Sequence, residues 1–346
     1  MIKHMKVGIQ FIFKVYYNQQ EAIRNKGRGI MRIAVLGCGR WASFLAWYLN
    51  NIGHDVVMWG REGSGHMKQW RETRSNGMLT MPESVCLTEK LEDVAETELF
   101  VISVAAQSLR EVLTQIAGYR PRGIVLCMKG IEQDTGFRLS QVAAQVLDSS
   151  WKVGVWLGPG HVQEFIRGVP NCMVLDSEDQ DYKLSLVDTF SGKLIRLYIG
   201  TDLLGNEIGA AAKNVVGIAA GMLDGIGRSS MKGALMARGA REVSRLIDAM
   251  GGDPISAYGL CHLGDYDATL YSKHSHNRHF GEAFIRKEPY DRLAEGVYTM
   301  KAMTKLAAEY RVELPICSAV EDILYRDIDV ETAFANLFLR SIKHEF

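Results

Sequence analysis

The sequence of 346 residues lacks three features, and each absence narrows the possible functions. No apolar run approaches the ~18 residues that a membrane span needs. The formal net charge is +0, so nothing global points to nucleic acid or an anionic membrane, and any anion site must be local. The six cysteines stand far apart, without a Cys-x-x-Cys pair or a histidine at metal-ligand spacing. We therefore expect no metal site, no nucleic-acid partner and a reducing, cytoplasmic compartment.

The first 30 residues differ from the rest of the chain. They are basic, with Glu21 as their only acidic residue, and polar residues interrupt their apolar stretch, Val7–Tyr17. No small-residue cleavage site follows, so the segment is a poor signal peptide. We expect residues 1–30 to be an extension outside the fold, or upstream sequence ahead of a true start at Met31.

From Met31 to about residue 200, short apolar runs alternate with helical patterns. The expected strands are Arg32–Leu36, Asp55–Trp59, Leu99–Val104, Gly123–Met128, Val153–Leu157, Cys172–Leu175 and Ile195–Ile199. Apolar residues at helical spacing mark Ser108–Ile116 and Leu139–Leu147. Strands rich in valine and isoleucine that alternate with helices indicate a parallel sheet covered on both faces.

After about Thr201 the pattern becomes helical, and no convincing strand remains. Leu204–Leu223 is almost wholly apolar and rich in small residues, which predicts a buried helix. Further helices are expected at Met231–Met250, Gly296–Tyr310, Ala319–Arg326 and Val330–Leu339. The sequence thus predicts an α/β domain over residues 31–200, followed by an all-helical domain over residues 201–346.

A glycine motif follows the first expected strand. The residues after Leu36 read Gly37-Cys-Gly39-Arg-Trp-Ala42, a Gly-x-Gly-x-x-Ala pattern that opens a helix over Trp41–Asn50. Gly37 permits a tight turn, Gly39 leaves room for a pyrophosphate, and Ala42 lets the helix pack on the strand. The helix N-terminus then faces the phosphates. This context predicts a Rossmann-type NAD(P)-binding domain; a glycine turn in an unrelated α/β protein is the alternative.

The end of the second strand bears on the choice of cofactor. A fold that prefers NAD usually carries an acidic residue there, which binds the ribose hydroxyls. This chain has Gly60 and then Arg61, whose guanidinium can pair with a 2′-phosphate. The neighbouring Glu62 argues the other way, and a solvated loop arginine is the alternative. We expect NADP(H) in preference to NAD(H).

The apolar helix expected after Thr201 contains a lysine. Lys213 is the only ionisable residue between Ile208 and Gly221. Burial disfavours an ammonium and lowers its pKa toward the range useful for acid–base chemistry. A dehydrogenase needs a base, because a proton leaves the hydroxyl as hydride leaves the carbon. The alternative is a lysine that extends out of a core helix into solvent.

Three other segments carry groups that suit the same chemistry. Lys129 follows an apolar strand, at the edge where such sheets bind ligands. Asp265 offers a carboxylate that can hold a lysine in position. The segment His274-Ser-His276-Asn277-Arg278 is a cluster of donors suited to a phosphate, or else a solvated basic loop.

Taken in order, these segments resemble the bacterial glycerol-3-phosphate dehydrogenase family, from Met31 to about Leu339. The motifs that carry the resemblance are Lys129-Gly-Ile-Glu132, Thr135-Gly136, Gly158-Pro159, Glu207-Ile-Gly-Ala-Ala-Ala-Lys213-Asn214, Gly264-Asp265 and Asn277-Arg278-His-Phe-Gly281. The resemblance implies reversible hydride transfer between NAD(P)H and dihydroxyacetone phosphate, giving sn-glycerol 3-phosphate for phospholipid synthesis. It also implies a homodimer.

The resemblance further implies a role for individual residues. Lys213 is expected to be the proton acceptor, with Lys129 and Asp265 beside it. The expected substrate contacts are Lys129, Lys213, Asn214, Asp265, Thr269, His276 and Asn277. The expected cofactor contacts are Gly37, Gly39, Arg40, Trp41, Ala42, Arg61, Lys129, Gly158, Arg278 and Glu295.

Two departures from the family pattern fall close to the expected site. The family usually has arginine where this chain has His276, so a permanent charge becomes one that titrates near neutrality. The family's Gly-Pro-Ser-Phe reads Gly158-Pro-Gly160-His161 here. Both departures leave room for a related dehydrogenase with another hydroxy acid or phosphorylated alcohol as substrate. A nucleotide sensor without turnover is a further alternative, although a sensor needs no buried proton acceptor.

Overall fold

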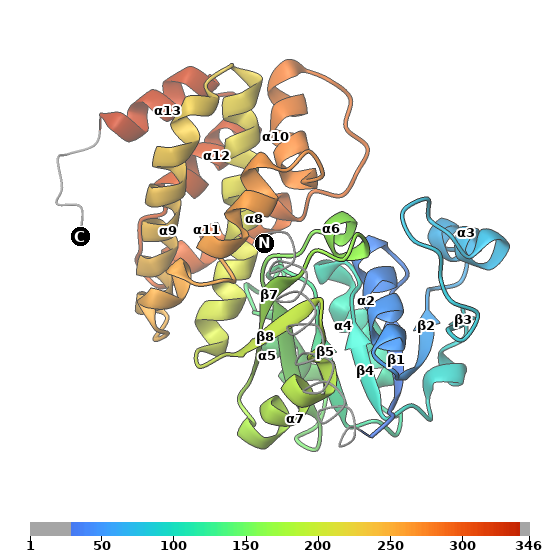
Figure 1. Cartoon of the computed structure of the whole chain (residues 1–346). Coiled ribbons are helices and arrows are strands. Elements are labelled where there is room, and N and C mark those ends of the chain that lie inside the picture. The colour runs from blue at the N-terminus through green and yellow to red at the C-terminus, as the bar shows by residue number, and fades with distance from the viewer. Residues whose placement is uncertain (1–28, 340–346) are drawn as a thin grey trace, which may run out of the picture.

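The computed structural model describes residues 29–339, so the extension expected at residues 1–30 lies outside the described residues except for its last two positions. Within this range the chain forms an α/β part and a helical part that pack side by side (Figure 1). The α/β part ends with β8 (Ile195–Ile199), and the helical part begins with α8 (Leu203–Gly225). The expected fold class, a Rossmann-type domain followed by a helical domain, is confirmed.

The α/β part is built on one sheet of eight strands in the order β3-β2-β1-β4-β5-β6-β7-β8. The strands are β1 (Arg32–Leu36), β2 (Asp55–Trp59), β3 (Cys86–Thr88), β4 (Leu99–Ile102), β5 (Gly123–Leu126), β6 (Lys152–Leu157), β7 (Asn171–Ser177) and β8. Side chains alternate between the two faces: Ile33 and Val35 join one apolar core, whereas Ala34 and Leu36 join the other. Both faces are therefore buried, as the nearly continuous apolar runs indicate.

Helices cover both faces of this sheet. The core that contains Ile33 includes side chains from α2 (Arg40–Asn51), α3 (Gly65–Thr73), α6 (Val162–Ile166) and α7 (Gln180–Phe190). The core that contains Ala34 includes side chains from α4 (Leu109–Ile116) and α5 (Leu139–Val146). Ala210 of α8 also joins this second core, which links the helical part to the sheet.

The expectation of a wholly parallel sheet is wrong for its last two strands. β7 pairs with β6 in the antiparallel direction, and β8 pairs with β7 in parallel. A parallel crossover needs a connection that spans the sheet, usually a helix. Between Leu157 and Asn171 the chain forms only α6, a helix of five residues. The chain therefore returns into the sheet at the end where β6 stops, and β7 runs in the opposite direction. The strand direction thus follows from a short connection, which the strand pattern does not reveal.

The helical part surrounds α8, which is buried over most of its length (Figure 1). Its other helices are α9 (Lys232–Ala249), α10 (His276–Arg286), α11 (Glu295–Glu309), α12 (Pro315–Tyr325) and α13 (Val330–Phe338). A Cβ atom at Gly221 of α8 would lie 1.9 Å from the carbonyl oxygen of Arg278 in α10. One at Gly281 would lie 2.1 Å from that of Ile218. The small residues of α8 therefore allow two helices to cross with their backbones almost in contact.

Several elements differ from the sequence-based expectation. Strand β3 and helices α3, α6, α7 and α10 were not expected, and α12 begins at Pro315 instead of Ala319. Proline is favoured in the first turn of a helix, and this marks the start of α12. After Ile199 the described residues form no strand, in agreement with the expectation. None of the helices within residues 29–339 combines the length and apolar character that a bilayer crossing requires.

Candidate active site

A cavity of about 1240 Å³ lies where the carboxyl ends of β1, β4, β5 and β6 meet the helical part. Its wall includes Gly37 after β1, Ser103 after β4, Lys129 after β5 and Gly158 after β6. Strand β1 pairs with β2 on one side and with β4 on the other, so the order of the strands reverses at this point. Open α/β sheets bind ligands at such a switch point.

The glycine turn after β1 forms one end of the cavity. Gly37 has a φ of 128°, and a Cβ atom there would lie 2.2 Å from the carbonyl oxygen of Ser103. A Cβ atom at Gly39, in contrast, would meet nothing within 4 Å. Gly39 caps α2 without a side-chain hydrogen bond, so the first amides of the helix face the cavity. Free amides at a helix N-terminus suit a pyrophosphate.

The end of β2 explains the missing acidic residue. A Cβ atom at Gly60 would lie 2.6 Å from the Sγ atom of Cys38, so no larger residue fits there without a shift. Arg61, Glu62 and Ser64 follow it on the cavity wall. Directly after β2 the wall therefore has a glycine and then a guanidinium where an NAD-preferring fold places a carboxylate, and the carboxylate of Glu62 follows one position later.

Gly160 has a role in packing. A Cβ atom at this position would lie 2.8 Å from the Cη2 atom of the Trp41 indole. Trp41 also contacts Phe165, with ring centroids 6.3 Å apart. The departure from the family's serine thus gives the indole room to lie against the backbone after β6.

Two lysines share one carboxylate deep in the cavity. Lys213 of α8 lies with its Nζ atom 3.0 Å from Oδ2 of Asp265, and Lys129 forms an ion pair with the same oxygen. Lys129 also donates to the carbonyl oxygen of Gly158 at 2.7 Å, and Lys213 donates to the hydroxyl of Thr269 at 2.8 Å. Asp265 is 1% exposed. The structure thus brings together residues that are far apart in the sequence.

The electrostatics of this cluster bring the pKa of Lys213 close to physiological pH. Burial is the main cause that lowers the pKa of its ammonium; Asp265 opposes this shift and the charge of Lys129 adds to it, and together they bring the pKa to about 8. A lysine with such a pKa can exchange a proton near physiological pH. The alternative of a lysine that extends into solvent is wrong, because Lys213 is only 8% exposed.

The other expected contacts lie nearby. Asn277 of α10 donates to the side-chain oxygen of Asn214 at 3.0 Å, and its own oxygen accepts from the backbone of Gly296 at 2.9 Å. Glu295 accepts from the amide of Ala106 at 3.1 Å, while its second oxygen is buried without a partner. Burial raises the pKa of this carboxyl group. Asn214, Asn277 and Glu295 all line the cavity.

His276 stands at the start of α10 and lines the same cavity. The segment before it is no loose basic loop, because Ser275 caps the helix and accepts a hydrogen bond from the amide of Arg278 at 3.3 Å. Burial lowers the pKa of the His276 imidazole, and the charges of Arg40 and Arg292 lower it further. The free protein therefore disfavours the imidazolium form at this position.

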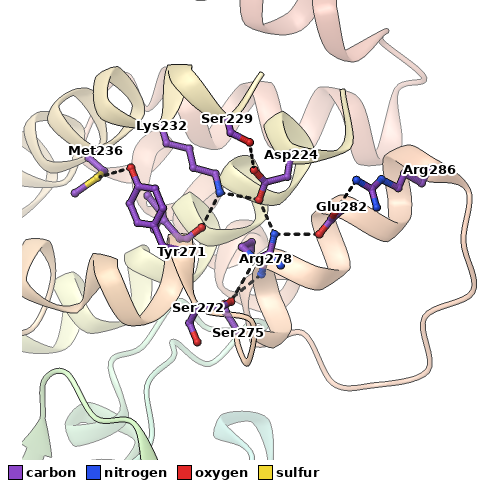
Figure 2. Close-up of polar contacts among 11 residues, drawn as sticks. Asp224, Ser229, Lys232, Met236, Tyr271, Ser272, Ser275, Arg278, Glu282 and Arg286 are labelled. Carbon is purple, nitrogen blue, oxygen red and sulfur yellow. Dashed lines mark hydrogen bonds and ion pairs between the residues drawn. The ribbon is translucent and has the colours of Figure 1, made fainter. Parts of the chain in front are cut away.

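Arg278 is the one expected contact that does not line the cavity. Figure 2 shows its guanidinium directed to Asp224, at 2.5 Å, and to Glu282, at 3.0 Å. Asp224 also accepts from Lys232 at 2.6 Å and from Ser229 at 2.6 Å. The cofactor role expected for Arg278 is therefore not what its contacts indicate. Instead it links α10 to α8 and, through Asp224, to α9, and its Nε atom donates to the carbonyl oxygen of Ser272 at 3.3 Å.

We expect the Arg278→Ala variant to lose about 1 to 3 kcal/mol of unfolding free energy, because a nearly buried Asp224 loses one of its charged donors. Its affinity for NADPH should stay close to that of the unaltered chain. Urea unfolding and fluorescence titration measure the two effects. Arg286→Ala is the matched control, because Arg286 reaches the same network only through Glu282 and is 47% exposed. Lost NADPH affinity with unchanged stability would contradict this assignment.

Sequence reasoning assigned no role to a second buried ion pair. Glu207 of α8 accepts from Arg138 at 2.5 Å, and from the amide and hydroxyl of Ser140 at 2.9 and 2.6 Å. These contacts fix the start of α8, and with it Lys213, to the first turn of α5. The sequence signal that could have indicated this ion pair is Glu207 itself, an ionisable residue near the start of an otherwise apolar helix.

Comparisons with known proteins agree with this geometry. Residues 32–183 match the model of the NAD-dependent glycerol-3-phosphate dehydrogenase N-terminus, and residues 202–335 match that of its C-terminus. The glycerol-3-phosphate dehydrogenase of Pelodictyon phaeoclathratiforme, of the NAD(P)+ type, is 35% identical over 332 residues, covering 91% of this chain and 99% of its own. One from Salinibacter ruber, of the same type, is 36% identical and covers 90% and 96%.

A solved structure gives the same result at the level of the fold. The crystal structure of glycerol-3-phosphate dehydrogenase from Coxiella burnetii has a TM-score of 0.83 and 27% sequence identity, and covers 90% of this chain and 99% of its own. Both halves of the chain, the sheet with its cavity and the helices that carry Lys213, therefore match one family along most of their length. The chain belongs to the NAD-dependent glycerol-3-phosphate dehydrogenase family.

Proposed function

We propose that this chain catalyses reversible hydride transfer between NAD(P)H and dihydroxyacetone phosphate, giving sn-glycerol 3-phosphate, with Lys213 as proton donor and acceptor. The observation that carries the proposal is the buried pairing of Lys213 and Lys129 with Asp265 in the cavity that the glycine turn also lines. A nucleotide sensor has no use for a buried lysine whose pKa lies close to physiological pH. The same cluster argues against a substrate without an exchangeable hydroxyl or carbonyl group.

The residues of the cluster divide the chemistry between them. When bound, the nicotinamide cofactor would supply the hydride acceptor for oxidation of the alcohol and the hydride donor for reduction of the ketone. Neutral Lys213 takes the hydroxyl proton during oxidation, and its ammonium returns that proton during reduction. Lys129 adds a fixed positive charge beside the oxygen, which stabilises developing alkoxide character. Asp265 and Thr269 hold the Nζ atom of Lys213 in place.

Other residues of the cavity suit binding. The first amides of α2 with Gly37, Gly39 and Ala42 would hold the pyrophosphate of the cofactor, and the indole of Trp41 would flank it. Asn277, at the start of α10, would bind the substrate's phosphate. We further propose that residues 31–200 form the cofactor-binding domain and residues 201–346 the substrate domain. We also propose that the protein is a cytoplasmic homodimer that supplies glycerol phosphate for phospholipid synthesis.

A coupled absorbance assay tests the proposal. Oxidation of NADH and of NADPH is followed by the fall in absorbance at about 340 nm. The substrates are dihydroxyacetone phosphate, unphosphorylated dihydroxyacetone and a panel of 2-keto acids. We expect turnover with the phosphorylated triose at least 100-fold more efficient than with any other, roughly the discrimination that unpaired phosphate-binding groups impose. Turnover of a 2-keto acid alone would favour the related dehydrogenase, and no turnover at all would favour a sensor.

The cofactor preference depends on Arg61. Replacing Arg61 by aspartate should weaken the use of NADPH at least 10-fold more than that of NADH, because a carboxylate repels the 2′-phosphate that the guanidinium binds. Steady-state kinetics with both cofactors measure the difference. His66→Ala, on the same wall of the cavity, is the control. Equal losses with the two cofactors would show that Arg61 does not read the 2′-phosphate.

A further inference from the structure

Two of the helices that begin at the cavity, α2 and α10, have a basic residue in first position. Arg40 is the first residue of α2, and His276 is the first residue of α10. Neither helix has an acidic residue in its first turn. The partial positive charge of a helix N-terminus favours acidic side chains there, so a cation at this position is destabilising. Local rules broken in this way are expected at functional positions.

Arg40 reaches from the α/β part to the helical part. Its Nη2 atom lies 3.5 Å from the carbonyl oxygen of His274, directly before Ser275 and His276. All four of these residues line the cavity. The guanidinium therefore lies at the end of the cavity where α10 begins, beside the cap that Ser275 provides.

The other lysines and arginines of the cavity wall are less well placed for an anion at the start of α10. Within the described part of the chain these are Lys129, Lys213, Arg61 and Lys90. Lys129 and Lys213 share Asp265, whereas Arg61 and Lys90 come after β2 and β3, and among the described residues neither side chain forms a hydrogen bond or ion pair with α10 or the residues before it. Arg278, which sequence reasoning placed near the cofactor, is paired with Asp224.

His276 is poorly suited to replace them. The groups that act on its ring are Arg40 from α2, Arg292 from the loop before α11 and His279 from α10. All of them are positive or neutral, and together with burial they lower the pKa of the imidazole; only a hydrogen bond with the backbone of Leu293 opposes them. The imidazole is thus mainly neutral at the pH where a phosphate monoester is a dianion.

We propose that Arg40, rather than His276, supplies the permanent positive charge that binds the substrate's phosphate and selects phosphorylated trioses. The inference rests on the proposed function, because it takes the substrate to be a phosphate monoester. A guanidinium offers paired donors that match phosphate oxygens, and it keeps its charge throughout the physiological range. The family's arginine at position 276 is thereby replaced by one that approaches the same anion from α2.

The principal test compares two Michaelis constants in one variant. Arg40→Gln should raise KM for dihydroxyacetone phosphate roughly 10- to 100-fold, the range expected when charged hydrogen bonds to a phosphate are lost. KM for the preferred nicotinamide cofactor should change less than about 3-fold, and inorganic phosphate should become a weaker competitive inhibitor. Lys68→Gln removes an exposed positive charge from α3 and is the matched control. Circular dichroism and a melting curve verify that each variant is folded.

A double variant that moves the positive charge from position 40 to position 276 tests whether both positions bind the same phosphate. If the two positions serve one anion, Arg40→Gln combined with His276→Arg should recover most of the lost affinity for dihydroxyacetone phosphate. Arg40→Lys, which keeps the charge without the paired donors, should lie between the unaltered chain and Arg40→Gln. It also tests the idea if the glutamine variant does not fold.

Three outcomes separate this inference from the proposed function. If the unaltered chain does not turn over dihydroxyacetone phosphate, the proposed function fails. If it does, but Arg40→Gln leaves that KM unchanged, only the inference fails. If Arg40→Gln instead raises KM for the cofactor, Arg40 binds the pyrophosphate and the inference is again wrong.

Discussion

Replacing Lys213 by methionine should lower kcat about 100- to 10,000-fold in both directions, the usual contribution of a positioned acid–base group. Methionine fills a similar volume within a buried helix but can neither accept nor donate the proton. KM for the nicotinamide cofactor should change little, because the residues assigned to cofactor binding are untouched. Steady-state assays in both directions give the loss.

The pH dependence gives an independent readout of the same residue. Because the pKa of Lys213 is lowered to about 8, its neutral form is well populated above that pH and its ammonium below it. Oxidation of glycerol 3-phosphate needs the neutral amine, so kcat/KM should rise with pH and level off above about 8. Reduction needs the ammonium, so its kcat/KM should fall as pH rises through the same value.

A second variant separates loss of the base from loss of volume. Lys213→Arg keeps a charge that does not titrate in this range, so it should lose oxidation about as severely as Lys213→Met. If Lys213→Met keeps both its activity and the inflection near pH 8, another group is the acid–base catalyst.

The parts of the site that follow from local sequence were predictable. The turn from Gly37 to Ala42 is fixed by a strand, two glycines and a helix that are neighbours in the chain. The buried state of Lys213 follows equally from the apolar residues on either side of it. In both cases the information lies within one or two elements.

The direction of a side chain on an unrecognised helix was not predictable. Asn277 and Arg278 are adjacent in the sequence, and both were expected at the ligands. In α10, however, successive side chains project about 100° apart around the axis. Asn277 therefore faces the cavity, while Arg278 faces Asp224 (Figure 2). The sequence pattern predicts a cluster of donors here and no helix, so it does not predict that the two side chains point in different directions.

Gly60 illustrates a second kind of limit. Its smallness is required by Cys38, which comes from the turn after β1 and lies 22 positions earlier in the chain. The sequence shows only that an acidic residue is missing after β2. The reason lies in the packing between two neighbouring strands of the sheet, which a local pattern does not contain.

Replacing Asp265 by asparagine should have the largest combined effect on stability and chemistry. The carboxylate is 1% exposed and pairs with two lysines, so its removal leaves both lysines in the cavity without a counter-charge. Breaking a buried ion pair from one side typically costs about 3 to 5 kcal/mol. Urea unfolding at neutral pH should show a loss of this order, because asparagine keeps the shape of the side chain but not its charge.

The same variant should move the pH profile in a defined direction. Asp265 acts to raise the pKa of Lys213, against burial and the charge of Lys129. Without the carboxylate the pKa falls below about 8, so the inflection in the oxidation profile should move to lower pH while kcat falls. Asp267→Asn is the matched control, because Asp267 is exposed and only two positions away. A variant at position 265 with unchanged stability and an unmoved inflection would show that this carboxylate does not control Lys213.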